Sequence, residues 1–415
     1  MRVLLVNLNP CLHFFIESLK QSCHEFVILD RYNNLNLSSR FKRIEIKNRY
    51  ELKLSYSDYN WEYLYPLIKN TIKKENIDFI FPYWPEINLE ILAELGEDKF
   101  PVRNFEILSS KSKYSNMFEQ FGIRVPETYF VGHPNLDLVE KIKTPCVCKP
   151  VKGTGGLGVF RANNKEELEH FLSPEKNFDK LEERTKFYID RTNGILHNYL
   201  YQSLGGEYLI QECIDGYILS VSGIKFCNSW RLDLVYDIEC NKQCSEIGFS
   251  YPSRFKGFDK IENVYSKVFN NIDFGIGPFM SDFIVKDNEL FLIDFGFRMS
   301  SSGFEILSYF DSTYVDKVIQ SSIDGKPFNF EINSQPFFSG FFDLPAGIIK
   351  SVKYPNQEKD QIYVDKTLNP GKRLFNSFSD LFVYDRGSGY FTGKNVIEAK
   401  RNFNRYQNQI EIEYE

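Results

Sequence analysis

The sequence of 415 residues has no apolar run of the roughly 18 residues that a membrane-spanning helix needs. It also lacks long runs of Lys or Arg, and its 50 basic residues stand against 56 acidic ones, for a net charge of −6. A protein that mainly grips the nucleic acid backbone is therefore disfavoured. The N-terminus, MRVLLVNLNP, has only a short apolar stretch before Asn7, which predicts a first strand rather than a signal peptide. We expect a cytoplasmic protein with neither a membrane nor a nucleic acid as partner.

Histidine is scarce, with five in the chain, and no Ser-His-Asp or Cys-His arrangement points to a nucleophilic enzyme. The eight cysteines are scattered. Cys240 and Cys244 have no second cysteine pair and no histidine nearby, while Cys146 and Cys148 alternate along an expected strand. These spacings are not those of a zinc site. We therefore expect reduced thiols, and most histidines at the surface.

The composition, 42% hydrophobic and 26% charged, is that of a folded globular protein, and the length predicts about two or three domains. Short apolar runs alternate with helical patterns in the first hundred residues, with strands at 3–6, 26–29 and 77–81 and helices at 11–23, 61–74 and 86–95. This alternation predicts a parallel α/β sheet with functional loops after its strands. No G-x-G-x-x-G motif follows the first strand, so a dinucleotide-binding domain loses its main support.

Farther along the chain, strands are expected at 145–150, 208–211, 219–226, 279–285 and 290–295, and helices at 111–121, 165–172 and 304–319. The C-terminal part is rich in strands, at 337–342, 348–352 and 381–384, followed by a helix near 395–407 and a final strand. The polar stretch 174–206 is interpreted as helices or as a mobile insertion.

A glycine-dense loop follows the strand that ends at Lys149-Pro150. Glycines frequently turn backbone N–H groups toward anionic oxygens, and a lysine just before the loop can reach a phosphate as a point charge. No G-K-[ST] follows, so this is not a Walker A loop. An ordinary glycine-rich turn remains the alternative. The loop consists of Gly153, Thr154, Gly155, Gly156, Leu157 and Gly158.

Two aspartates lie on strands joined by a turn at Asp287-Asn288. In such a hairpin Asp282 and Asp294 are close to cross-strand neighbours, and two carboxylates on one face repel unless a cation lies between them. Oxygen ligands of this kind suit Mg²⁺, which binds one or two carboxylates together with substrate phosphates. Arg298 follows four residues later and can hold a carboxylate or phosphate.

Together these motifs resemble the ATP-grasp carboxylate–amine ligases, in the branch that includes amino-acid ligases and biotin carboxylase. The resemblance spans about residues 1–410. It rests on the order of its motifs along the chain: the lysines, the glycine loop, an interdomain hinge at 208–216, and two strands with the expected metal ligands at 277–282 and 292–298. Motifs of the C-terminal domain follow, such as 340–349 and 385–393. It implies a parallel-sheet pre-ATP-grasp domain at 1–110. An α+β ATP-grasp domain would follow at 111–326, with a mobile lid at about 128–208, and a small β-rich domain at 327–415.

The resemblance also implies roles for individual residues. ATP would be held by Lys113, Lys149, the loop residues Gly153, Thr154, Gly155, Gly156 and Gly158, and the hinge residues Gln211, Glu212 and Ile214. Asp282 and Asp294 would bind Mg²⁺, with Mn²⁺ as the alternative ion. Arg298 and Lys149 would serve catalysis, and Arg298 would also contact substrate. Glu86 is either a substrate contact or an ordinary acid at a helix N-terminus.

The chain departs from the family pattern at three places. Asp294 stands where the family usually has Glu, and Gly296 stands where an Asn usually supplies another metal ligand. Ile218 replaces the Glu that normally holds the ribose hydroxyls. One metal ligand and one ribose contact are therefore missing from the expected set.

The chemistry implied is activation of a carboxylate as an acyl phosphate, followed by attack of an amine and release of ADP and phosphate. The partners would be a small-molecule acid and amine, and a homodimer stays open. A carboxylase of the same superfamily and a nucleotide-binding module without catalysis are the alternatives. Gly296 and Ile218 favour the second alternative, whereas the retained lysines, aspartates and Arg298 oppose it.

Overall fold

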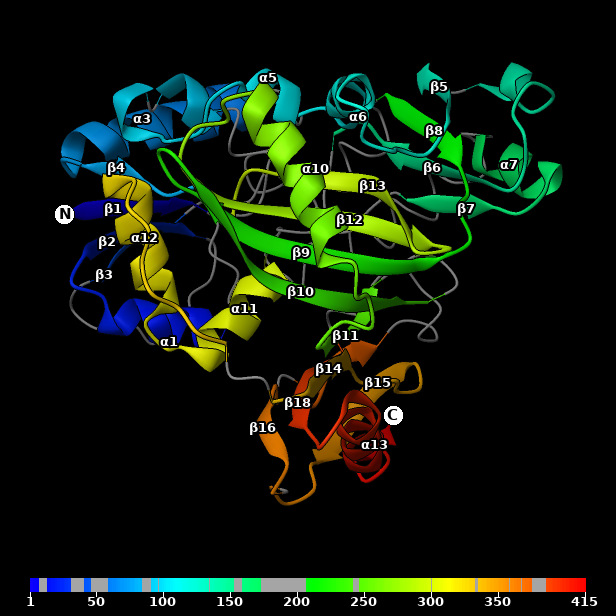
Figure 1. The fold of residues 1–415 in the computed structure, drawn as a ribbon. Coiled ribbons are helices and arrows are strands. Elements are labelled where there is room, and N and C mark those ends of the chain that lie inside the picture. Colours follow the sequence, from blue (N-terminus) through cyan, green and yellow to red (C-terminus); the bar gives the residue numbers. More distant parts are fainter. Residues whose placement is uncertain are drawn as a thin grey trace.

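The computed structural model describes residues 1–6, 13–30, 41–45, 59–83, 91–95, 97–133, 135–152, 159–172, 207–241, 246–299, 301–332, 335–357, 359–366, 368–374 and 386–415. Four predicted features lie wholly or largely outside these ranges: Glu86, the glycine loop 153–158, the insertion 174–206 and the strand 381–384. Figure 1 shows the arrangement of the rest.

The N-terminal part forms the predicted parallel sheet. Its strand order is β3-β2-β1-β4, and every pair is parallel. The strands are β1 (Arg2–Val6), β2 (Glu25–Asp30), β3 (Phe41–Glu45) and β4 (Phe79–Ile80), and the helices are α1 (His13–Gln21) and α3 (Tyr65–Lys74), the latter preceded by a π-helical turn at Tyr59–Leu64. Because parallel strands end at one edge, the loops after β1 and β4 share that edge.

The centre of the molecule is an eight-stranded antiparallel sheet with the order β13-β12-β9-β10-β11-β14-β18-β16. Its strands are β9 (Tyr217–Lys225), β10 (Trp230–Cys240), β11 (Glu246–Tyr251), β12 (Gly277–Lys286), β13 (Glu289–Gly296), β14 (Phe337–Phe341), β16 (Gln361–Val364) and β18 (Ser388–Thr392). Three of these strands come from beyond residue 326, so the sheet continues across the predicted domain boundary. The boundary itself stays a prediction.

Helices cover both faces of this sheet. On β9 the apolar side chains Leu219 and Val221 point into a core shared with α10 (Phe258–Asn271), while Ser220 and Ser222 point to the opposite face. That opposite face packs against α11 (Ser301–Phe310). A sheet buried on both faces cannot shift its register without exposing one of its cores, so it is a rigid platform.

A smaller four-stranded sheet, ordered β5-β8-β6-β7, contains β5 (Thr128–Gly132), β6 (Cys146–Pro150), β7 (Phe160–Ala162) and β8 (Tyr208–Glu212). With α7 (Lys165–Leu172) it encloses a core of its own, to which Cys146 and Cys148 both contribute. The alternating positions of the two cysteines along the sequence predict that they share one face of the strand. The predicted lid range covers most of this unit and is otherwise untested. Before it come the short helix α5 (Phe105–Leu108) and α6 (Lys111–Gln120).

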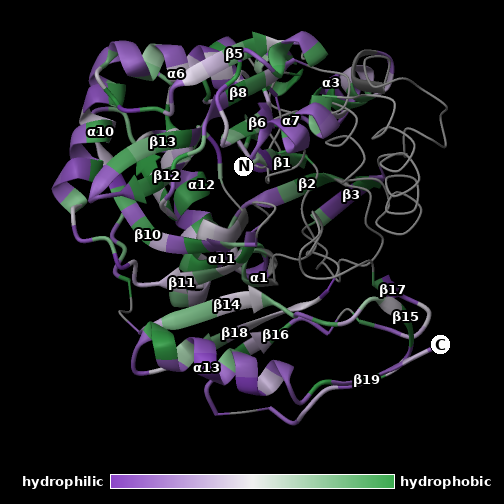
Figure 2. Cartoon of the chain, turned by 90° about the vertical axis from the view of Figure 1, so that its right-hand side faces the viewer, coloured by the Kyte–Doolittle hydropathy of each residue, from purple (hydrophilic) through white to green (hydrophobic). Residues whose placement is uncertain are grey.

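The C-terminal part adds a three-stranded sheet, β17-β15-β19, and a helix. These elements are β15 (Gly347–Lys353), β17 (Arg373–Leu374), α13 (Val396–Gln407) and β19 (Glu411–Tyr414). Hydrophobic and hydrophilic residues alternate along α13 in Figure 2, and its buried side includes Phe403 and Tyr406.

The predicted single helix at 304–319 is wrong. The chain forms two helices, α11, which ends at Phe310, and α12 (Tyr314–Asp324). The Asp311 carboxylate accepts hydrogen bonds from the backbone N–H of Thr313 at 2.9 Å and from its hydroxyl at 2.6 Å. An aspartate that bonds the backbone two residues on favours a turn over a continuous helix.

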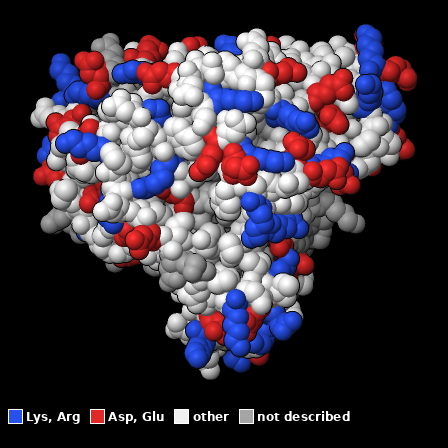
Figure 3. All heavy atoms as spheres, in the orientation of Figure 1, with Lys and Arg blue, Asp and Glu red and all other residues white. Residues whose placement is uncertain are grey.

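The surface seen in Figure 3 has basic and acidic side chains interspersed, without one large field of either sign. Among the helices in the described ranges, none is long and apolar enough to cross a membrane.

Candidate active site

The two aspartates lie on the hairpin β12–β13. Asp287 and Asn288 form its turn with left-handed φ angles of 50° and 60°, which Asn and Asp tolerate better than most residues. Lys286 pairs with Glu289 directly beside this turn. The predicted hairpin is therefore confirmed.

A β-bulge decides which residue faces Asp282. Regular pairing from the turn reaches Phe283 opposite Leu292, and one further step would place Ile293 opposite Asp282. The register shifts between Asp282 and Phe283, so Asp282 pairs with Asp294 and Ile293 is the extra residue. The bulge therefore brings the two carboxylates into direct opposition.

Four side chains form a row across four strands in register. Tyr236 on β10 pairs with Ser220 on β9, Ser220 pairs with Asp282, and Asp282 pairs with Asp294. Neighbouring strands lie about 4.8 Å apart, so the row is about 14 Å long. We call it the side-chain row, and its two ends differ in chemistry.

Cationic groups gather at the Asp294 end, which we call the cation end. Lys111 Nζ lies 3.3 Å from Asp294 Oδ1, and the Tyr114 hydroxyl donates to the same oxygen at 2.6 Å. Buried Lys149 donates from Nζ to the carbonyl oxygen of Ile293 at 2.8 Å. A bulge residue is unpaired in the ladder, which explains why this carbonyl is open to a lysine.

Arg298 is the third cation near the aspartates. Its side chain is buried, and Nη1 donates to the carbonyl oxygen of Met299 at 3.3 Å. The guanidinium lowers the pKa of both Asp282 and Asp294, though it is a secondary influence on each.

The electrostatics at the cation end are tightly balanced. Burial favours the neutral form of Asp294, but Lys111 and then the Tyr114 hydrogen bond outweigh it, so the pKa of Asp294 is lowered. Burial, followed by repulsion from Lys111, lowers the pKa of Lys149 to about 8. Both groups are therefore charged at neutral pH, and an anion entering this end meets positive charge that is already desolvated.

Asp282 lies in a different situation. Burial, followed by repulsion from Asp294, raises its pKa to about 7. Its Oδ1 is buried and has no hydrogen-bonding partner among the described residues. An orphaned carboxylate oxygen directly opposite a second carboxylate fits the ligand set of a hard divalent cation such as Mg²⁺.

The other end of the side-chain row, which we call the acid end, has acids and hydroxyls. Glu246 pairs with Cys240, which lies on the same face of β10 as Tyr236. Burial, followed by repulsion from Asp282, raises the pKa of Glu246 well above its usual range. Within the described part of the chain, the buried hydroxyl of Ser222 has no hydrogen-bonding partner. This end can bind a cationic or hydrogen-donating group.

The lysine of α6 that lies beside the aspartates is Lys111, whereas the sequence analysis had chosen Lys113. Lys111 is the first residue of α6 and contacts Asp294, whereas Lys113 is exposed. Two residues along a helix turn the side chain by about 200°, so only one of the pair can face the aspartates. The structure therefore places Lys111, and not Lys113, in the constellation.

The hinge residues are close to β6 but their side chains are occupied or covered. Gln211 donates from Nε2 to the Pro126 carbonyl at 3.2 Å and to the Thr128 hydroxyl at 3.1 Å, and Ile214 is buried. Glu212 is partly buried and pairs through its backbone with Cys146. A nucleotide contact of Gln211, Glu212 and Ile214 stays a prediction.

Two connections bring neighbouring elements to the site. The backbone N–H of Lys111 donates to the carbonyl of Val151 at 2.9 Å, which ties the start of α6 to the segment that leads into the glycine loop. Met299 N–H donates to the Pro82 carbonyl at 2.9 Å, and Tyr83 forms a parallel bridge with Met299. The loop edge of the N-terminal sheet therefore meets the chain directly after Arg298.

No model of a known protein family matches the chain, and no curated protein matches it. Solved structures do. The L-amino acid ligase from Bacillus licheniformis superposes with a TM-score of 0.77 at 16% identity and covers 100% of this chain and 98% of its own. The N5-carboxyaminoimidazole ribonucleotide synthetase from Thermotoga maritima gives 0.67 at 15% identity, covering 100% and 99%.

A third similar structure is the biotin carboxylase domain of the 2-oxoglutarate carboxylase from Hydrogenobacter thermophilus, in complex with MgADP and bicarbonate. Its TM-score is 0.66 at 12% identity, and it covers 99% of this chain and 90% of that one. All three are ATP-grasp enzymes. The predicted ATP-grasp fold is confirmed over the whole chain.

Proposed function

We propose that this protein is an ATP- and Mg²⁺-dependent ligase that activates a carboxylate as an acyl phosphate and joins it to an amine, with release of ADP and phosphate. One observation carries the proposal: Asp282 and Asp294 oppose each other in register, and Lys111, Lys149 and Arg298 lie around them. An ATP-grasp fold that keeps this constellation has the groups needed to bind a nucleotide triphosphate and transfer its terminal phosphoryl group.

Asp282 and Asp294 would hold the Mg²⁺, because the two residues are cross-strand partners and Asp282 Oδ1 has no partner in the described ranges. The ion would supply charge neutralisation for the phosphates. Gly296 contributes no side chain there, so the chain offers one ligand fewer than the related enzymes are expected to have. Lys111 and Lys149 would bind phosphate oxygens, and the bulge carbonyl of Ile293 holds the Lys149 ammonium in place.

In the first step an oxygen of the acid substrate attacks the γ-phosphorus of ATP. The bond from that phosphorus to the bridging oxygen breaks, and ADP leaves with the electron pair. Lys149 and Lys111 offset the negative charge on the transferred group. The products are an acyl phosphate and ADP.

In the second step the amine attacks the acyl carbon, the tetrahedral oxyanion collapses and phosphate leaves. Arg298, buried beside the aspartates, would stabilise the oxyanion. Glu246 would accept the amine proton, since its raised pKa makes it a stronger base than an ordinary glutamate. The acid end of the row therefore suits an amine as the acceptor.

The glycine-loop residues Gly153, Thr154, Gly155, Gly156 and Gly158 keep their predicted role over the phosphates in this proposal. β6 ends at Pro150 and β7 begins at Phe160, so the loop connects two neighbouring strands of the small sheet.

The test is ADP release measured with Mg²⁺-ATP across amino acids, other small acids and bicarbonate, singly and in pairs. Mass spectrometry then identifies the product. A product equal to acid plus amine minus water supports the ligase. ADP release that needs bicarbonate and yields a carboxylated product would assign the chain to the carboxylases. A folded sample that shows no thermal shift with millimolar Mg²⁺-ATP would contradict nucleotide binding altogether.

A further inference from the structure

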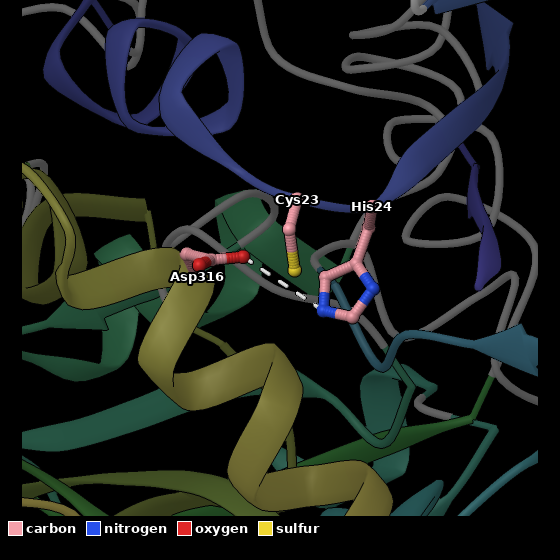
Figure 4. A group of neighbouring side chains, drawn as sticks. All are labelled: Cys23, His24 and Asp316. Atoms are coloured by element: carbon pink, nitrogen blue, oxygen red, sulfur yellow. Dashed lines mark ion pairs between the residues drawn. The ribbon is translucent and has the colours of Figure 1, made fainter.

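The connection between α1 and β2 contains a cluster that the proposed active site does not use. Cys23, His24 and Asp316 bring Sγ, an imidazole nitrogen and a carboxylate oxygen within 4.8 Å of one another. His24 Nε2 lies 3.8 Å from Asp316 Oδ1. Figure 4 shows the three side chains converging from the α1–β2 connection and from α12.

His24 is buried with only 3% of its surface exposed, whereas the two other histidines whose burial is described, His133 and His170, are exposed. Neither ring nitrogen has a hydrogen-bonding partner among the described residues. Burial, ahead of the opposing attraction of Asp316, lowers the pKa of the ring. A buried imidazole whose two nitrogens have no hydrogen-bonding partner in the described ranges has unsatisfied polar atoms, so the cluster is incomplete without another atom.

The backbone around the cluster holds the ligands in place. The Ser22 hydroxyl donates to Asp316 Oδ1, and the backbone N–H of His24 donates to the Ser22 oxygen at 3.1 Å. Cys23 is exposed at the surface, so its side chain can turn toward the other two. A residue that orients a ligating carboxylate is a common feature of metal sites.

We propose that Cys23, His24 and Asp316 bind a divalent transition metal, with Zn²⁺ the best match for one sulfur, one nitrogen and one oxygen ligand. Zn²⁺ takes sulfur at about 2.3 Å and nitrogen or oxygen at about 2.0–2.2 Å, so tetrahedral ligand atoms lie about 3.3–3.8 Å apart. The separation of 3.8 Å between His24 Nε2 and Asp316 Oδ1 exceeds the roughly 3.6 Å upper limit for nitrogen and oxygen ligands by about 0.2 Å, which a small side-chain rotation would close. Water completes the coordination, because the described ranges contribute three ligands.

The location separates this site from the proposed chemistry. β1 and β2 begin at Arg2 and Glu25, so His24 lies at the amino edge of the parallel sheet, whereas Tyr83 and Met299 meet at its opposite edge. The metal would join the α1–β2 connection to α12 and stabilise the N-terminal sheet on the central one. This proposal does not depend on the ligase function.

The experiment uses the full chain, stripped with a chelator and dialysed against Zn²⁺ in the presence of excess Mg²⁺, which occupies hard carboxylate sites. Metal content and melting temperature are measured for the wild type, Cys23→Ser and Asp316→Asn. Cys227→Ser is the matched control, because Cys227 is also an exposed free thiol. We expect one tightly bound Zn²⁺ in the wild type and in Cys227→Ser, and an affinity at least about tenfold lower in the other two variants.

Co²⁺ in place of Zn²⁺ provides a second readout that loss of fold cannot imitate. A thiolate bound to Co²⁺ gives a charge-transfer absorption in the near ultraviolet, which the wild type should show and Cys23→Ser should lack while retaining its melting temperature without metal. Absence of stoichiometric Zn²⁺ in the wild type, or equal Zn²⁺ affinity in Cys23→Ser, would overturn the proposal. So would loss of binding in Cys227→Ser to the same extent.

Discussion

The two ends of the side-chain row lie on one face of one sheet, yet their surroundings are opposite. At the cation end Asp294 has Lys111 at 3.3 Å and a tyrosine hydroxyl at 2.6 Å, and its pKa is lowered. At the acid end Glu246 faces another carboxylate, and its pKa is raised. The same sheet therefore offers one end that suits a polyanion such as a phosphate chain and another end that suits a cationic or hydrogen-donating group. Asp282 lies between them and belongs fully to neither.

The largest effect should come from removing the charge of Asp294. We expect Asp294→Asn to lower acid- and amine-dependent ADP release by more than about a hundredfold, because the cations around it lose the carboxylate that organises them and Mg²⁺ loses a ligand. Glu289→Gln, at the exposed start of the same strand, is the matched control and should keep nearly full activity. Wild-type turnover in Asp294→Asn would remove this residue from the site.

Next in size is the effect of the lysines on α6. Lys111→Ala should weaken ATP binding about tenfold, as expected for a lost hydrogen bond between charged groups. Lys113→Ala should leave it unchanged, because Lys113 is exposed. Titration calorimetry with a non-hydrolysable ATP analogue compares the two. The reverse result would restore Lys113 to the role that the sequence predicted for it.

At the acid end, Glu246→Gln keeps the shape of the side chain but removes the base. We expect KM for the amine to rise several-fold and kcat to fall, with little change in KM for ATP. Glu239→Gln is the control, because Glu239 neighbours the same region of the sheet but pairs with Lys400 on α13. An unchanged KM and kcat for the amine in Glu246→Gln would leave the acid end without a function in the second step.

The smallest expected effect is on stability: at alkaline pH, the substitution Asp282→Asn should stabilise the protein. In the folded protein the pKa of Asp282 is raised to about 7 from an ordinary value of 3.8, so its contribution to stability is fully present below about pH 3.8 and is lost progressively as pH rises to about 7. Asp282→Asn removes this loss. Without divalent cations its melting temperature should exceed that of the wild type by about 2 °C or more at pH 8.5, and the difference should shrink steadily as pH falls toward 4.

Differential scanning calorimetry in the presence of a chelator measures this effect. Adding Mg²⁺-ATP should then raise the melting temperature of the wild type and leave that of Asp282→Asn nearly unchanged. If Asp282→Asn were less stable than the wild type at pH 8.5, Asp282 would be a residue that stabilises the fold. Its repulsion with Asp294 would then not be a feature that a bound cation relieves.

The sequence predicts the hairpin well because its turn residues and alternating strands are local signals. It also predicts three strands of the parallel sheet from their short apolar runs, but it misses β3, whose sequence FKRIE is mostly charged. It does not predict β10, where Asp233 and Asp237 interrupt the apolar pattern. The structure accommodates these acids through distant partners: Tyr314 donates to Asp233, and Ser253 donates to Asp237 at 2.5 Å. Such compensation is invisible in a local window.

The residues of the candidate active site also divide into those that local motifs predict and those that only the tertiary structure reveals. Lys149, Asp282, Asp294 and Arg298 could be chosen from motifs, and the structure gathers all four. Glu246 was missed because it enters only through the pairing of β10 with β11. The choice between Lys111 and Lys113 required the start of α6, which the Ser110 hydroxyl marks by accepting from the backbone N–H of Lys113 at 3.5 Å. A serine before an expected helix is a typical N-cap, and it could have predicted which residues of α6 face the aspartates.

The extra residue of the β13 bulge has a consequence for how such a site can be inherited or lost. Removal of Ile293 would restore an even ladder in which Asp282 still opposes Asp294 and could leave the hairpin folded, yet it would delete the carbonyl that holds Lys149. A deletion of one codon would thus do more damage than most substitutions nearby. In divergent descendants, the spacing between the two aspartates is therefore a better marker of a working site than the identity of the residues between them.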